Sequence, residues 1–212
     1  MALGQLALSL NTIGWQNIAF GMNSLKSDTT GNSNISIGSN AMLNYTSGTF
    51  NIAIGDWALS STAGSGDRNT ALGNLSLSSI TTGSDNIGIG ASSLLWTTVG
   101  INNISIGYQW LKSNTSGTNN TAIGYQWCYS STTWTNNIGI GYNSLYFTTG
   151  WNNIAFGSNT LKNATSTSNC IAIGNSWMIN SSSGYYNIGI GEATLTNVST
   201  GSYNLALLQN AL

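Results

Sequence analysis

The chain has 212 residues, of which 4% are charged, and its formal net charge at pH 7 is −1. So little basic charge excludes a surface for the phosphate backbone of nucleic acid, and no apolar run approaches the ~18 residues that would span a membrane. The sequence has no His, its carboxylates are scattered and its two Cys are isolated, so we expect no enzyme activity, no metal site and no cofactor.

A phrase close to Asn-Ile-Ala-Ile-Gly recurs along the whole chain. It ends at Gly4, Gly21, Gly38, Gly55, Gly73, Gly90, Gly107, Gly124, Gly141, Gly157, Gly174 and Gly191, with Leu208 in the thirteenth place. Ten of the twelve steps are 17 residues long, one is 18 (Gly55 to Gly73) and one is 16 (Gly141 to Gly157). A short period kept from end to end indicates one supersecondary unit stacked on itself. We therefore predict a single all-β domain over residues 1–212, a β-solenoid of about 13 coils.

Each copy predicts the same elements in the same order: a short strand such as 34–37, a glycine turn, and a loop back to the next copy. The isoleucine columns stand three and one residues before each glycine, as Ile35 and Ile37 do, and share one side of a strand. A leucine column, represented by Leu25, follows four residues after each glycine. We expect these three columns to face one continuous core, with the strands stacked parallel and in register.

The residue that opens the phrase is Asn in eleven of twelve full copies, and Cys170 is the exception. Stacked identical Asn side chains can hydrogen-bond along a ladder, so we predict such a ladder for this asparagine column. Cys128 stands in the leucine column, three coils away from Cys170. At ~4.8 Å per coil, the two thiols are too far apart for a disulfide.

The residue between the isoleucine columns is always small. By parity we expect it to face away from the core, where another copy of the chain packs closely against it around a shared axis, as in a homotrimer. A tight corner within one coil is the alternative. The small column comprises Ala19, Ser36, Ala53, Ala71, Gly88, Ser105, Ala122, Gly139, Ala155, Ala172 and Gly189.

Aromatic residues gather just after the closing glycine in the middle of the chain. Tyr108, Tyr125 and Tyr142 occupy one column, and Trp110 and Trp127 stand two residues further on. Stacked aromatic rings flanked by amides suit sugar rings or a partner surface. Stacking that only stiffens the rod is the alternative interpretation.

A column of Thr and Ser suggests a different function, because flat rows of hydroxyls on an almost uncharged solenoid resemble some ice-binding surfaces. Its place beside a glycine turn, and not within a strand, argues against that function. The threonine column comprises Thr12, Thr29, Thr46, Thr81, Thr98, Thr115, Thr132, Thr148, Thr165, Ser182 and Ser199.

The repeated phrase resembles the head repeats of trimeric autotransporter adhesins, and the longer unit that begins at Asn120 is similar to arrays in phage tail-fibre proteins. The resemblance implies an extracellular or virion fibre segment that is homotrimeric and presents a receptor-binding surface, with cell-surface glycans or receptors as partners. Because the chain begins and ends inside the repeat, we expect a segment of a longer fibre, or a subunit that stacks end to end into filaments.

Overall fold

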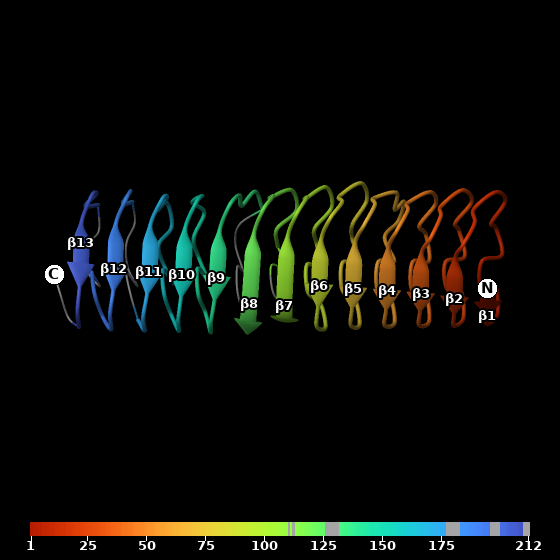
Figure 1. Cartoon of the computed structure of the whole chain (residues 1–212), viewed down its shortest axis with the longest axis horizontal. Helices are drawn as coiled ribbons and strands as arrows, with labels where there is room; N and C mark the ends of the chain where they lie inside the picture. Colours follow the sequence, from red (N-terminus) through yellow and green to blue (C-terminus); the bar gives the residue numbers. More distant parts are fainter. Residues whose placement is uncertain (110, 112, 126–131, 177–182, 196–199, 210–212) are drawn as a thin grey trace.

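The computed structural model describes residues 1–212 except 110, 112, 126–131, 177–182, 196–199 and 210–212. Thirteen short strands follow one another in chain order in a single sheet (Figure 1). They are β1 (Ala2–Leu3), β2 (Ile18–Phe20), β3 (Ile35–Ile37), β4 (Ile52–Ile54), β5 (Thr70–Leu72), β6 (Ile87–Ile89), β7 (Ile104–Tyr108), β8 (Thr121–Tyr125), β9 (Ile138–Ile140), β10 (Ile154–Phe156), β11 (Ile171–Ile173), β12 (Ile188–Ile190) and β13 (Leu205–Leu207). Residues outside the description interrupt some coils, so the described chain makes about 11 turns of a parallel β-solenoid.

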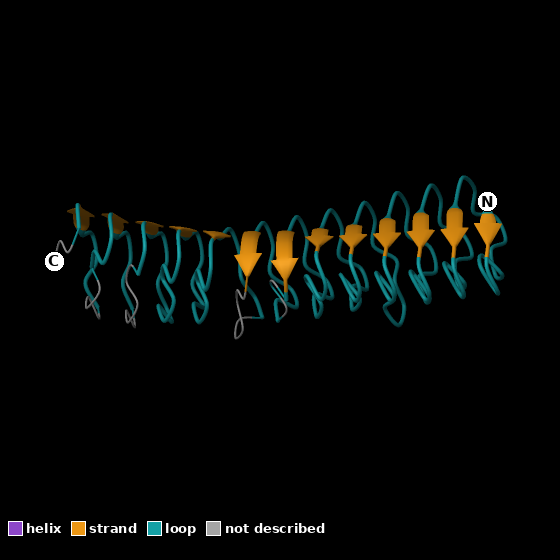
Figure 2. Ribbon diagram, turned by 90° about the horizontal axis from the view of Figure 1, so that it is seen from below, coloured by secondary structure: helices purple, strands orange, loops and turns teal. Residues whose placement is uncertain are grey.

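Every strand pairs in parallel and in register with its neighbours, so that Ile35 lies opposite Ile18 and Ile52 opposite Ile35. The two steps of unusual length keep this register, because Thr70 still pairs with Ile52 and Ile154 with Ile138. Figure 2 shows the strands as one row, with the loops of each coil passing round to the other side. The predicted all-β, in-register solenoid is confirmed, and the described ranges contain no helix.

The closing glycines turn the chain sharply at the end of each strand. The twelve of them have φ between 117° and 141°, a region that side chains with a Cβ rarely enter. Space is equally short, because a Cβ on Gly21 would lie 2.5 Å from the carbonyl oxygen of Gly38 in the next coil. The predicted glycine turn is therefore confirmed, and neighbouring coils require Gly there for two separate reasons.

The strand side chains point the opposite way from the prediction. All eleven residues of the small column are buried inside the coil, and the isoleucine columns lie on the outer face of the sheet. The interior is too narrow for Ile: the hydroxyl of Ser24, across the coil, donates to the Oγ of Ser36 at 2.7 Å and to its carbonyl oxygen at 2.9 Å. The prediction that the small column packs against another copy is wrong, because its close neighbour is the far wall of its own coil.

The leucine column does fill the core, as predicted. Leu25, Leu77, Leu111 and Leu161, for example, are completely buried. Cys128 and Met178 of this column lie outside the described residues. With Leu on one wall and Asn, Ser and Ala on the others, the core is thin, and it becomes continuous only because the coils stack.

The asparagine column forms the predicted ladder. The backbone N–H of most of these Asn residues donates to the side-chain oxygen of the Asn one coil earlier, as Asn51 does to Asn34 at 2.9 Å. The side-chain amide donates to a carbonyl in the second turn of its own coil, as from Asn34 to Gly48 at 2.7 Å. Cys170 keeps a weaker form of this pattern: its N–H donates to Asn153 at 3.1 Å, and its buried thiol lies 3.5 Å from the carbonyl oxygen of Gly184. Cys128 lies outside the description, so the predicted absence of a disulfide stays a prediction.

Each coil of unusual length lies next to a large buried aromatic ring from the coil before it. Tyr45 is completely buried, and its hydroxyl donates to the carbonyl of Gly66 in the 18-residue coil at 3.1 Å. Trp134 stands where all other coils but one have Gly, and its indole N–H donates to the carbonyl of Thr148 in the 16-residue coil. The changes in length therefore accommodate side chains that are too large for a regular coil.

Candidate functional site

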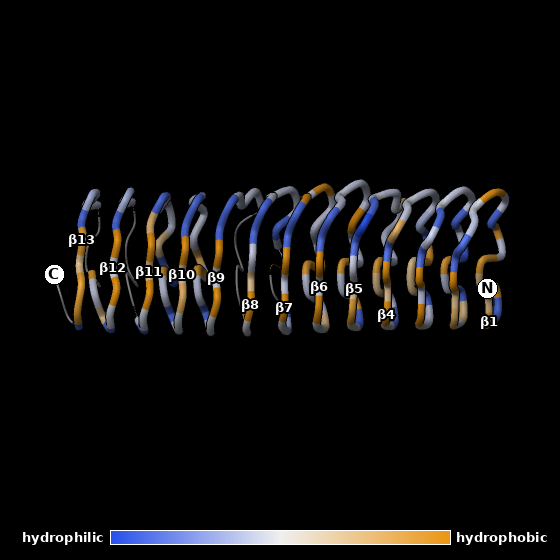
Figure 3. The backbone as a smooth tube through the Cα atoms, viewed as in Figure 1, coloured by the Kyte–Doolittle hydropathy of each residue, from blue (hydrophilic) through white to orange (hydrophobic). Residues whose placement is uncertain are grey.

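The outer face of the sheet carries the isoleucine columns, which are apolar except at Thr70 and Thr121. Figure 3 shows hydrophobic residues recurring in the strands along the rod. The side chains of this face belong to the isoleucine columns, and they are partly or fully exposed in every strand. Among them, Ile37, Ile54, Ile106, Ile138, Ile154, Phe156, Ile173 and Ile190 are 36–53% exposed. Successive strands align these side chains into two straight rows, because the pairing is in register.

This face is at the upper end of the apolar patch sizes found on soluble monomers. Thirteen strands in one sheet give twelve spacings of ~4.8 Å, and a strand three residues long is ~10 Å wide, so the plane covers roughly 600 Å². The largest apolar patch on a typical monomer is about 300–600 Å² and is often functional. The outer face is therefore the leading candidate for a functional surface.

The three tyrosines of the predicted platform do come together. The ring centroids of Tyr108 and Tyr125 are 5.9 Å apart with an interplanar angle of 16°, and those of Tyr125 and Tyr142 are 6.1 Å apart with an angle of 6°. The rings are 46–48% exposed. In β7 and β8 they follow the parity of the outward isoleucines, so they widen the outer face. Trp110 and Trp127 lie outside the described residues, and sugar binding by the platform stays a prediction.

The hydroxyls of the threonine column form hydrogen bonds from one coil to the next. Thr29 donates to the carbonyl of Thr46 at 3.0 Å, and Thr98 donates to that of Thr115 at 3.1 Å. Assigning Thr148 to this column is wrong, because the shorter coil places Thr149 there and buries Thr148. Hydroxyls that already bond the next coil are less available to ice, so the structure gives that alternative no new support.

A second Asn ladder lies on the surface, and the sequence reasoning missed it. The side-chain amide of Asn119 donates to Asn136 at 3.0 Å, and Asn136 donates to Asn152 at 2.9 Å. Asn102 and Asn169 extend the row at its two ends. These residues have φ of 56–58°, a conformation that Asn tolerates better than most residues. The repeated Asn-Asn pairs in the sequence were the available signal.

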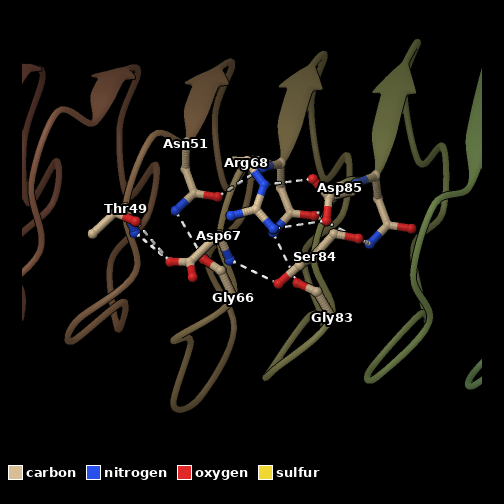
Figure 4. A network of polar contacts seen from close by, with 10 residues as sticks. Thr49, Asn51, Gly66, Asp67, Arg68, Gly83, Ser84 and Asp85 are labelled. Atoms are coloured by element: carbon tan, nitrogen blue, oxygen red, sulfur yellow. Dashed lines mark hydrogen bonds and ion pairs between the residues drawn. The ribbon is translucent and has the colours of Figure 1, made fainter.

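Several charged residues connect one coil to the next. Arg68 makes two hydrogen bonds to the carboxylate of Asp85, at 2.6 and 2.9 Å, and Asp67 accepts the backbone N–H of Thr49 at 2.7 Å (Figure 4). The hydrogen bond from Arg68 lowers the pKa of Asp85 below its ordinary value. Within the described part of the chain, no three His, Cys, Asp or Glu side chains come close enough to hold a metal ion.

Asp28 is a carboxylate inside the coil. It accepts hydrogen bonds from the side chain of Asn11 at 2.8 Å and from the backbone N–H of Gly31 at 2.9 Å. Desolvation raises its pKa above the ordinary value, although these two donors oppose the shift. One partner is in the preceding coil and the other is in the same coil, so Asp28 stabilises the second turn and connects it to its neighbour.

No family model, curated protein or solved structure matches this chain. Over the residues that the structure describes, a helix of the length and hydrophobicity needed to cross a membrane is absent. The functional assignment therefore rests on the geometry of the outer face.

Proposed function

We propose that the chain is a non-enzymatic structural and adhesive fibre segment whose copies associate through the outer face of the sheet. The observation that carries this proposal is the two rows of outward side chains on the sheet, which are Ile in most strands and Leu, Phe or Thr in the others. The resemblance to adhesin heads implies that three copies pack around one axis. Such a rod would space or present a receptor-binding surface on a virion or a cell.

A second copy of this chain is the occupant that suits the face best. No charged residue stands in the strands β1 to β13, so two such faces can approach without electrostatic repulsion or the desolvation of a charge. Two copies also share the same strand spacing, so their rows of branched side chains can interdigitate over the full length. Removing that much apolar surface from water is the main driving force for obligate association.

The test places charges on the outer face. In the variant Ile54→Lys, Ile106→Lys and Ile173→Lys, the three side chains lie on β4, β7 and β11 and leave the coil interior untouched. We expect the wild-type chain to assemble at micromolar concentration and this variant to be monomeric with an unchanged circular dichroism spectrum. Native mass spectrometry would count the chains and distinguish three copies from two.

A matched control carries the same added charge elsewhere. Thr30→Lys, Ser47→Lys and Ser116→Lys replace exposed loop residues that lie outside the strands, and this variant should assemble as the wild type does. A wild-type chain that stays monomeric would contradict the proposal, as would a face variant that assembles normally.

A further inference from the structure

The 18-residue coil opens a hollow on the turn side of the solenoid. In regular coils, a run of turns extends from the closing glycine to the sixth residue after it. In the 18-residue coil, this run ends just before Ser60. Ser60 and Ser61 are only 9% and 4% exposed, whereas the equivalent Ser78 and Ser79 in the next coil are partly exposed. The depression lies over the recessed segment and has a volume of about 410 Å³. Its size is within the range of small-molecule sites.

One wall of the hollow is an exposed tryptophan. Trp57 is 43% exposed, and its column holds Asn40 in the coil before and Leu75 in the coil after. Its backbone φ is 59°, close to that of Asn40 and Leu75 at the same place in the neighbouring coils. An exposed indole adds little to the core, so its ring face is available for contact with a molecule outside the coil.

The remaining walls offer hydroxyl and amide groups. Ser60, Ser78, Ser79 and Asn44 line the hollow, and none of the lining residues is charged. Among the residues that the structure describes, the hydroxyls of Ser60, Ser78 and Ser79 have no hydrogen-bond partner. Groups that can both donate and accept therefore surround a flat aromatic ring.

We propose that this hollow binds a neutral saccharide. The apolar face of a pyranose ring would stack on Trp57, and its hydroxyls would exchange hydrogen bonds with Ser60, Ser78 and Ser79. The uncharged walls favour a neutral sugar over a sialylated or phosphorylated one, because nothing there offsets the desolvation of an anion. The inference rests on the adhesive part of the proposed function and names its partner class; none of the residues that line the hollow belongs to a strand of the sheet.

The experiment titrates the full chain with methyl glycosides of glucose, galactose, mannose and N-acetylglucosamine at millimolar concentration, with a sialic acid glycoside as the charged comparison. Saturation-transfer NMR detects binding, and calorimetry measures the dissociation constant of any glycoside that binds. We expect at least one neutral glycoside to bind and the sialoside not to bind.

Two variants locate the site. Trp57→Asn suits the left-handed backbone and extends the row that Asn23 and Asn40 already form at 3.0 Å, so the fold should persist while the affinity falls about tenfold or more. Ser78→Ala with Ser79→Ala removes two unpartnered hydroxyls and should weaken binding about threefold to tenfold. Trp15→Leu changes a tryptophan that is 60% exposed outside the hollow and should have no effect.

The outcome decides both proposals separately. If no neutral glycoside binds the wild-type chain, or if both hollow variants bind as tightly as the wild type, the saccharide site is wrong. Assembly is measured on the same samples by mass. Loss of sugar binding in a variant that still assembles would support the site, and a monomeric wild type that binds sugar would overturn only the self-association.

Discussion

At the scale of single residues, the buried Asn ladder is the main polar device that joins coil to coil. Asn103 donates to Asn86 at 3.1 Å and to the carbonyl of Gly117 at 2.8 Å, and it accepts the backbone N–H of Asn120 at 3.1 Å. Every one of these groups is shielded from water by the coils on either side. Removing one rung therefore leaves donors and acceptors without partners.

Adjacent asparagines provide a matched test of this idea. Asn103→Ser should lower the free energy of unfolding by about 2–4 kcal/mol, because a hydroxyl is too short to replace the amide contacts. Asn102→Ser affects only the surface ladder, in a column where Ser33 already occurs, and should cost less than about 1 kcal/mol. Chemical denaturation measures both. Equal losses would show that burial is not what makes the ladder important.

Asp28 gives the solenoid a specific pH dependence. Because desolvation raises its folded-state pKa above the ordinary value of 3.8, the folded chain favours the protonated carboxyl. Its contribution to stability is present below the unfolded-state pKa and is lost as the pH rises through the folded-state pKa. Asn114 stands in the same column and accepts the N–H of Gly117 at 3.0 Å, so Asn is compatible with this position.

We therefore expect the difference in unfolding free energy between the wild type and Asp28→Asn to shift against the wild type as the pH rises from about 3 through the acidic range. Denaturant titrations at a series of pH values measure this difference. The slope with pH is the readout, since the absolute stability also reflects rearranged hydrogen bonds to Asn11. Parallel pH profiles for the two proteins would contradict the assignment.

At the scale of the strand, the sequence predicted position, direction and register correctly but reversed the two faces. The strands, the glycine turns and the Asn ladder follow directly from a phrase repeated every 17 residues. The faces were reversed because large apolar residues were assumed to point inward. In this coil, Leu25 and the Asn side chains already fill the space, and only a residue such as Ser36 fits between them.

The candidate sites were less predictable than the strands. The small column did indicate a close approach, but its partner is the opposite wall of the same coil. The hollow beside Trp57 depends on how one extra residue is accommodated, which the spacing alone does not specify. Likewise, Tyr45 and Trp134 stand in columns that other coils fill with quite different residues, so their burial could not be inferred from the repeat.

In the 18-residue coil, Gly64 leaves room for the buried ring of Tyr45. A Cβ there would lie 2.0 Å from Cδ2 of Tyr45, although the backbone conformation would accept other residues. Gly64→Ala should lower the free energy of unfolding by about 3 kcal/mol through overpacking. Tyr45→Ala alone leaves a cavity and should cost about 3–5 kcal/mol.

The double variant Tyr45→Ala with Gly64→Ala distinguishes crowding from a general effect. It should be more stable than the sum of the two single changes predicts, by at least about 1 kcal/mol, because the new methyl group enters the space that the ring has left. Ser65→Ala serves as the neighbouring control and should be close to neutral. Additive costs would show that Gly64 is required for some reason other than the ring.

At the scale of the whole molecule, each strand contacts only the strand before it and the strand after it. Stability in such an array is close to a sum over coils and their interfaces. A complete coil should therefore be removable, provided that the register of the remaining strands is restored.

Deleting residues 18–34 joins Asn17 to Ile35 and removes one 17-residue step. We expect this shorter chain to fold with the same circular dichroism signal per residue and a slightly smaller denaturant dependence of unfolding. Deleting residues 22–29 instead shortens one coil by eight residues, too many to pass round the interior, and should abolish cooperative unfolding of the N-terminal coils. Similar behaviour of both deletions would contradict the modular description.

The direction of the sheet hydrogen bonds has a mechanical consequence. Bonds such as that from Ile35 N–H to the carbonyl of Asn51 connect one coil to the next, so they run along the rod. Tension applied at the two ends loads successive coils in series, and extension begins wherever the bonding is poorest, as at Cys170, where a thiol replaces the amide. Lateral association would let neighbouring rods bear that load together.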